Sequence, residues 1–158
     1  MHSLPYLNNT FRPMQSLPGE AISEKKQMIK YKEGVIIGKP ALAGMVILVA
    51  LRTISSALGL NLTITSGYDG EHGAGSILEQ DPHYTGEAYD VRSHDFTDEQ
   101  KIDILVRLRQ LLGVDMFYAF LENPGLANEH FHIQRRKGRV LTIEYVIDNF
   151  LLVRNSNV

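Results

Sequence analysis

Apolar residues recur at three- and four-residue steps between residues 40 and 58, the spacing of one face of an α-helix. Six side chains lie mostly at these steps: Leu42, Met45, Val46, Val49, Ile54 and Leu58. Pro40 suits the first helical position, where no backbone donor is needed, and Gly59 suits a left-handed helix end. The pattern therefore predicts a helix over Pro40–Leu58.

A second helical pattern begins with a capping box. Thr97 suits the N-cap, and Gln100 follows three residues later, so each side chain can bond the other's backbone N–H. Gly113 suits the end of this helix. The apolar positions expected to face inward are Ile102, Ile104, Leu105, Leu108 and Leu111 or Leu112.

Short stretches rich in β-branched, aromatic and other apolar residues predict four strands. These are Leu60–Thr65, Glu87–Val91, Asp115–Leu121 and Phe131–Gln134. The segment Asn123–Gly125 predicts a turn, Arg135–Arg139 a basic turn, and Leu141–Val153 a last helix or a mixture of strand and helix. The pattern thus predicts an α+β domain in which two main helices pack on a small, mostly antiparallel sheet.

The first residues differ from this body. Residues 1–20 contain Pro5, Pro13 and Pro18 and predict an extended N-terminal arm, whereas 21–158 form the single domain. Within that domain, Ser23–Lys32 is predicted to form a helical turn. The N-terminus lacks a basic start followed by an apolar core, so we expect no secretory signal.

Composition narrows the classes of function. The chain has 158 residues and a net charge of −2, which favours neither nucleic acid nor an anionic membrane as a partner. The longest apolar run, Ala41–Leu51, is shorter than the roughly 20 residues that span a bilayer. The chain has no cysteine, which excludes disulfides, thiol nucleophiles and cysteine-bound zinc. Histidines and carboxylates remain as metal ligands.

Two separated segments carry such ligands. His83 and Asp90 flank Gly86 and Ala88, whose small size permits a tight turn and close approach of the backbone. His132 follows about forty residues later. Three such ligands leave the fourth position of a tetrahedral zinc ion for water, the pattern of a catalytic site.

The spacing His83-x-x-Gly86-x-Ala88-x-Asp90, followed by Glu129-x-x-His132, resembles the zinc D-alanyl-D-alanine carboxypeptidase family. That family includes phage L-alanyl-D-glutamate endopeptidases, and the hedgehog signalling domain shares its fold. The resemblance covers roughly Leu60–Gln134. It implies Zn²⁺ held by His83, Asp90 and His132, with Glu129 as the general base.

The role of Glu129 depends on where the last strand begins. If the strand starts after Glu129, its carboxylate can face the metal. If the strand already runs through Glu129, alternate residues face opposite sides, so Glu129 points away and His130 shares the metal face. We expect the first arrangement, with His130 as a second catalytic partner.

Three further residues are candidates for binding substrate. Arg92 lies two residues after Asp90 and could hold a substrate carboxylate, or could instead pair with an acid such as Asp95. Ser76 resembles the family's serine ahead of the first ligand, and its alternative is an ordinary loop hydroxyl. His72 could reach the pocket or lie exposed.

The chain also departs from the family pattern. The family places its serine two residues before the first histidine, whereas here 77–82 separates Ser76 from His83. We expect this insertion to gate the pocket. The family also has an arginine after the strand end that matches Ser66–Tyr68, whereas Asp69 to His72 follow here, so another group must stabilise the oxyanion.

The expected function is that of a zinc peptidase which cleaves the peptidoglycan stem peptide. Its size and missing signal resemble a monomeric phage endolysin, kept in the host cytoplasm until its release to the cell wall, or a virion-associated lytic enzyme. The alternative is a non-catalytic zinc-binding domain of the same fold that serves binding or assembly.

Overall fold

The computed structural model describes residues 29–68 and 81–150. Five strands form one open sheet in the order β1-β2-β3-β5-β4. They are β1 (Lys30–Tyr31), β2 (Thr63–Ser66), β3 (Ala88–Arg92), β4 (Phe117–Glu122) and β5 (His130–Arg135). Strand β1 pairs with β2 in parallel, and the other neighbouring pairs are antiparallel. The predicted α+β class with a mostly antiparallel sheet is confirmed.

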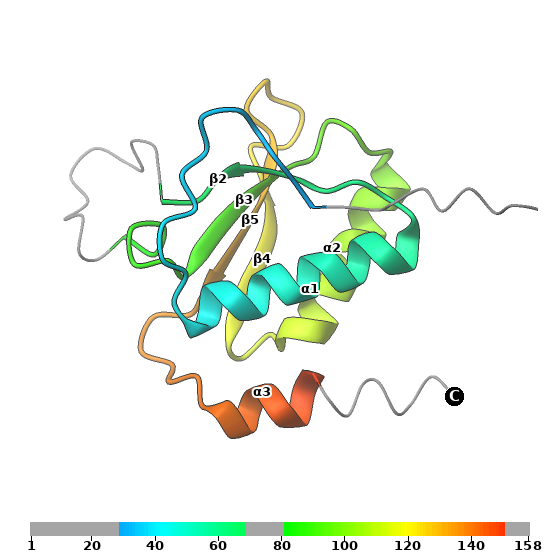
Figure 1. Cartoon of the computed structure of the whole chain (residues 1–158). Helices are drawn as coiled ribbons and strands as arrows, with labels where there is room; N and C mark the ends of the chain where they lie inside the picture. The colour runs from blue at the N-terminus through cyan, green and yellow to red at the C-terminus, as the bar shows by residue number, and fades with distance from the viewer. Residues whose placement is uncertain (1–28, 69–80, 151–158) are drawn as a thin grey trace, which may run out of the picture.

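Three helices accompany the sheet: α1 (Leu42–Leu58), α2 (Asp98–Leu112) and α3 (Ile143–Phe150). Helices α1 and α2 pack against each other on one side of the sheet, and α3 lies below them near the end of α2 (Figure 1). Among residues 29–68 and 81–150, no helix is both long and apolar enough to cross a bilayer.

The helix ends follow the predicted chemistry with one exception. Thr97 and Gln100 form both bonds of the capping box, and Gly59 ends α1 in the left-handed region with φ 67°. Gly113 ends α2, as predicted. Pro40, however, lies outside α1, because Ala41 is the extended N-cap residue and the helix begins at Leu42.

The core lies between the helices and one face of the sheet. Tyr89 and Val91 of β3 and Phe131 and Ile133 of β5 are fully buried on this face. They pack in one cluster with buried side chains of α1 and α2, which are Ile47, Leu51, Ile54, Ile104, Leu108 and Leu112. The intervening residues of each strand therefore project from the opposite face.

Several predicted positions need correction. Ile102 does not face the core: it is 63% exposed, because α2 turns Ile104, Leu108 and Leu112 inward. Lys30 and Tyr31 form a strand rather than a helical turn. Arg135 belongs to β5 rather than to a turn. The last segment is helical from Ile143. The predicted arm, 1–20, lies outside the described residues.

Helix α1 begins against the turn that follows His83. Gly86 in this turn has φ 71°, and its carbonyl accepts a hydrogen bond from the N–H of Ala41. A Cβ at Gly44 would clash with the carbonyl oxygen of Gly86. The glycine in the first turn of α1 therefore lets the helix and the turn pack backbone to backbone.

The substitution Gly44→Ala tests this contact. Alanine favours a helix by about 1 kcal/mol over glycine. The clash with Gly86 should outweigh this gain and lower the free energy of unfolding by about 1–3 kcal/mol in total. Urea denaturation measures the change, and Ser56→Ala on the exposed side of α1 is the control, expected to stay within about 0.5 kcal/mol of the parent. Equal or greater stability of Gly44→Ala would contradict the close contact.

Candidate metal centre

The turn before β3 holds His83 in place. The backbone N–H of His83 donates to Oδ1 of Asp81 at 2.9 Å, and the N–H of Gly86 donates to the carbonyl of His83. Nδ1 of His83 lies 3.0 Å from the carbonyl oxygen of Gly67, so Nδ1 carries the proton that this bond needs. The other ring nitrogen, Nε2, is then the unprotonated one and lies 3.5 Å from Oδ1 of Asp90.

The register of β3 and β5 brings the other two candidates together. Asp90 lies directly opposite His132, and Oδ1 of Asp90 is 2.8 Å from Nδ1 of His132. Nε2 of His132 lies 2.9 Å from Oε1 of Gln134. Gln134 is thus placed to accept the Nε2 proton and leave Nδ1 as the ligand atom, the arrangement that outer partners of metal-bound histidines adopt.

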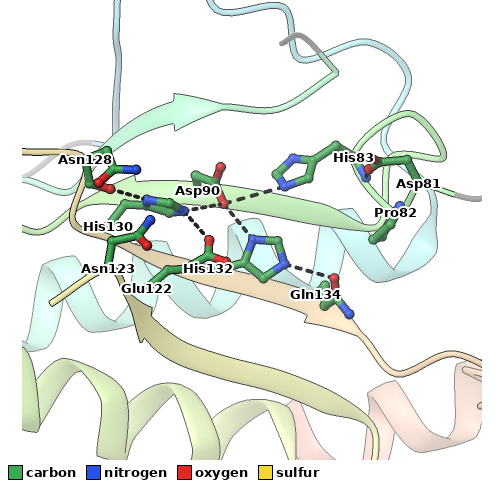
Figure 2. A pocket seen from close by; sticks show the side chains of 10 residues that line it. All are labelled: Asp81, Pro82, His83, Asp90, Glu122, Asn123, Asn128, His130, His132 and Gln134. Carbon is green, nitrogen blue, oxygen red and sulfur yellow. Dashed lines mark hydrogen bonds and ion pairs between the residues drawn. The ribbon is translucent and has the colours of Figure 1, made fainter. Parts of the chain in front are cut away.

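His83, Asp90 and His132 together could hold a metal ion. Their ligand atoms all lie within 4.8 Å of one another, and Figure 2 shows the three side chains converging in front of β3 and β5. Two imidazoles and one carboxylate are ordinary ligands for divalent transition metals. The predicted triad is therefore confirmed as a cluster that fits a metal ion.

The electrostatics of the cluster favour an ionised Asp90. Burial alone would raise the pKa of Asp90, which is 8% exposed, but the hydrogen bond with His132 and the nearby His83, His132 and His130 hold that pKa below its usual value. Burial would lower the pKa of His132, but its bonds to Asp90 and Gln134 raise it. A carboxylate surrounded by imidazoles thus keeps its negative charge.

The cluster lies in an open hollow of about 450 Å³. Its lining comes from the turn before β3, from β3 and β5, and from the end of β4 with the loop after it (Figure 2). The lining residues are Asp81, Pro82, His83, Asp90, Glu122, Asn123, Asn128, His130, His132 and Gln134. A small part of a polymer could enter such a cleft.

Glu129 does not face this hollow, contrary to our expectation. Its Oε1 accepts a hydrogen bond from Ser93 at 2.7 Å and lies 2.9 Å from Nζ of Lys101, while its Oε2 accepts from the N–H of Gly125 at 2.8 Å. Strand β5 begins at His130, after Glu129, as in the first of the two arrangements. The Glu129 side chain nevertheless lies on the side of Lys101 and Ser93, whereas His130 lines the hollow, as in the second.

His130 occupies the hollow with a partner that we did not predict. Glu122 lies opposite His130 in the β4–β5 pair, and its Oε2 is 2.8 Å from Nε2 of His130. Nδ1 of His130 faces the carbonyl of Asn128 at 2.7 Å. Both ring nitrogens thus lie within hydrogen-bond distance of oxygen acceptors.

Glu122 and Gln134 had a sequence signal that we overlooked. Tyr118, Phe120 and Glu122 alternate with buried Phe117 and Ala119 along β4, so all three point to the open face. Gln134 lies two residues after His132 and shares its face for the same reason. Ending the predicted strand at Leu121 hid the position of Glu122.

The other candidate residues are not brought to the centre. Arg92 lies on the same face of β3 as Asp90 and opposite His130, but it does not line the hollow. Ser76 and His72 lie outside the described residues, as does most of the inserted segment 77–82. Their proposed roles stay predictions.

A second trio of possible ligands overlaps the first. Glu122, His130 and His132 also have ligand atoms within 4.8 Å of one another. The Glu122 side chain is 44% exposed, whereas His83 and Asp90 in the first trio are buried. Since the two trios share His132, they are overlapping candidates for one ion, and the trio with His83 and Asp90 is the more buried.

Comparison of the chain with protein-family models, with curated proteins and with solved structures finds no match. The candidate function therefore depends on the site itself and on the sequence motif.

Titration with Zn²⁺ or Co²⁺ tests the metal centre and the part that Gln134 plays in it. His83→Ala and Asp90→Ala should abolish binding of one ion per chain. Gln134→Ala should weaken binding about 10–100-fold, because His132 loses the acceptor that orients its ring. Gln110→Ala, at an exposed position of α2, is the matched control and should bind the ion as tightly as the parent does. Undiminished binding in His83→Ala and Asp90→Ala would exclude the site.

The buried Glu129 predicts a specific dependence of stability on pH. The Gly125 N–H, Lys101 and Ser93 lower its pKa from 4.5 to about 2. A carboxyl with a lowered folded-state pKa stabilises the fold above pH 4.5, and this stabilisation disappears as the pH falls toward 2. In thermal denaturation, the melting temperature of Glu129→Gln should therefore be well below that of the parent at pH 7 and close to it near pH 2. A difference in melting temperature that does not change with pH would contradict this assignment.

Proposed function

We propose that this chain is a zinc-dependent peptidase that hydrolyses a peptide bond in the peptidoglycan stem peptide. One observation supports the proposal most: a buried His–Asp–His trio forms the floor of an open hollow, and a Glu–His pair lies beside it. Three protein ligands leave a zinc ion with a position open for water or substrate. The peptidoglycan substrate is inferred from the motif resemblance alone.

The choice of zinc follows from the ligand chemistry. Two imidazoles and a single carboxylate suit zinc better than magnesium or calcium, which prefer oxygen ligands. Bound zinc would supply a Lewis acid that activates water and polarises a carbonyl. The bonds that hold His83 and His132 through Gly67 and Gln134 would keep both rings ready to bind it.

The residues beside the trio would handle the protons. Glu122 lies within 4.8 Å of a ligand atom of His132 and is partly exposed, so its carboxylate is placed to accept a proton from an attacking water. His130, with acceptors at both ring nitrogens, would donate a proton to the leaving amine or stabilise the oxyanion. This pair would take over the role that the motif gives to Glu129.

Substitutions of Glu122 and His130 test these two roles. Glu122→Gln and His130→Gln should each keep zinc and lower the rate of peptide cleavage by a factor of about 10²–10⁴, the usual worth of an acid or base group. Glu129→Gln, assayed below its melting temperature, should stay within a few-fold of the parent. If a folded, zinc-loaded Glu129→Gln is inactive while Glu122→Gln is active, Glu129 is the base after all.

A second function deserves a test because Glu129, the base in the motif, is bound by Lys101, Ser93 and Gly125. A zinc domain that binds without cleaving would have no need of a free base at that position. Purified peptidoglycan incubated with the protein should release new amino groups, and a chelator should stop the release. Full zinc occupancy without any chelator-sensitive release would favour the binding domain.

A further inference from the structure

Apart from its histidines, the hollow is lined by ionisable side chains of one kind, the carboxylates. Asp81, Asp90 and Glu122 contribute three carboxylates, and the described lining contains no lysine or arginine. Asp81 is only 6% exposed, and its Oδ1 already accepts the backbone N–H of His83. A divalent ion bound by the trio would leave the wall at Asp81 and the rim at Glu122 negative (Figure 2).

Three described cations of the surrounding elements are held elsewhere, and Arg92, which shares a face of β3 with Asp90, does not line the hollow. Lys101 lies against Glu129, and Arg135 pairs with Glu87 through Nη2 at 2.7 Å. The guanidinium of Arg136 stacks 3.6 Å over the ring of Tyr118. These engagements draw three positive groups away from the hollow.

The segment that leads into Asp81 adds no fixed positive charge. Residues 69–80 include Asp69, Glu71 and Glu79 but no lysine or arginine. This is a statement of composition and holds for any conformation of the segment. Neither the described lining nor this neighbour in sequence supplies the guanidinium or ammonium that a carboxylate needs.

A carboxypeptidase must hold a free terminal carboxylate next to the scissile bond, usually with an arginine fork or a lysine. Placing that carboxylate between Asp81 and Glu122 would bring like charges together in a partly desolvated site, which is costly. An ammonium group would instead be attracted by these carboxylates. The side-chain amides of Asn123 and Asn128 on the same rim could accept hydrogen bonds from it.

We propose that the site acts on an internal peptide bond whose neighbouring residue carries an amine, and that Asp81 contributes to this selectivity. The inference rests on the proposed peptidase function. It separates two reactions that the motif leaves open, since a C-terminal carboxylate is usually held by a cationic side chain, which cleavage within a chain does not need.

Matched peptides test the bond preference in the zinc-loaded full chain. Each peptide is offered with a free C-terminal carboxylate and as the C-terminal amide, with lysine, norleucine or glutamate beside the scissile bond. The amide with lysine should have a kcat/KM at least about tenfold above the free acid and above the glutamate peptide, and added salt should reduce this difference. Equal or faster cleavage of the free acid would overturn the inference while leaving the peptidase intact.

Binding provides a second test that needs no turnover. Nα-acetyl-lysine amide should shift the imidazole resonances of the zinc-loaded protein, whereas Nα-acetyl-glutamate amide should not. Asp81→Asn, which keeps the size and the bond to the His83 N–H, should reduce the lysine preference in both experiments. Binding of the glutamate probe as strong as that of lysine would overturn the inference, and absence of cleavage with the lysine preference retained would overturn only the peptidase function.

Discussion

The cross-strand pair of Asp90 and His132 is the interaction on which the site depends. It exists because β3 and β5 pair in one register, with Asp90 opposite His132 and Arg92 opposite His130. A slip of one residue would move every side chain of a strand to the other face. That slip would bury Asp90 or His132 against the helices, so the core that holds Val91 and Phe131 also protects the site.

Among the described elements, the helices cover one face of the sheet, and the candidate site lies on the opposite face. A buried carboxylate is costly unless it is paired, and Asp90 lies 2.8 Å from His132 and 3.5 Å from both His83 and His130. The three imidazoles come from a turn and from alternate residues of one strand. A metal ion among them would satisfy the same carboxylate, so one arrangement serves the fold and the proposed chemistry.

The sequence predicted what depends on local spacing. Helix ends at Gly59 and Gly113, the capping box at Thr97 and the strand that carries Asp90 follow from neighbouring residues, and the structure confirms them. The meeting of His83 and Asp90 with His132 was predicted from the motif spacing. The hedgehog-type fold that the motif implied stays a prediction.

What failed depends on tertiary contacts that no local pattern contains. Glu129 was expected to face the metal, but Lys101 of α2 and Ser93 after β3 offer its carboxylate better partners on the opposite side. Glu122 was missed because its role arises only from the pairing of β4 with β5. A strand predicted one residue short was enough to hide it.

X-ray absorption at the zinc edge tests the central claim most directly. In the zinc-loaded protein it should show a shell of nitrogen and oxygen at about 2.0–2.1 Å with outer scattering from two imidazole rings and no sulfur. Replacing His132 with alanine should remove one ring from that pattern or release the ion. A six-coordinate, purely oxygen shell, or a spectrum that His132→Ala does not change, would contradict the assignment of the metal to His83, Asp90 and His132.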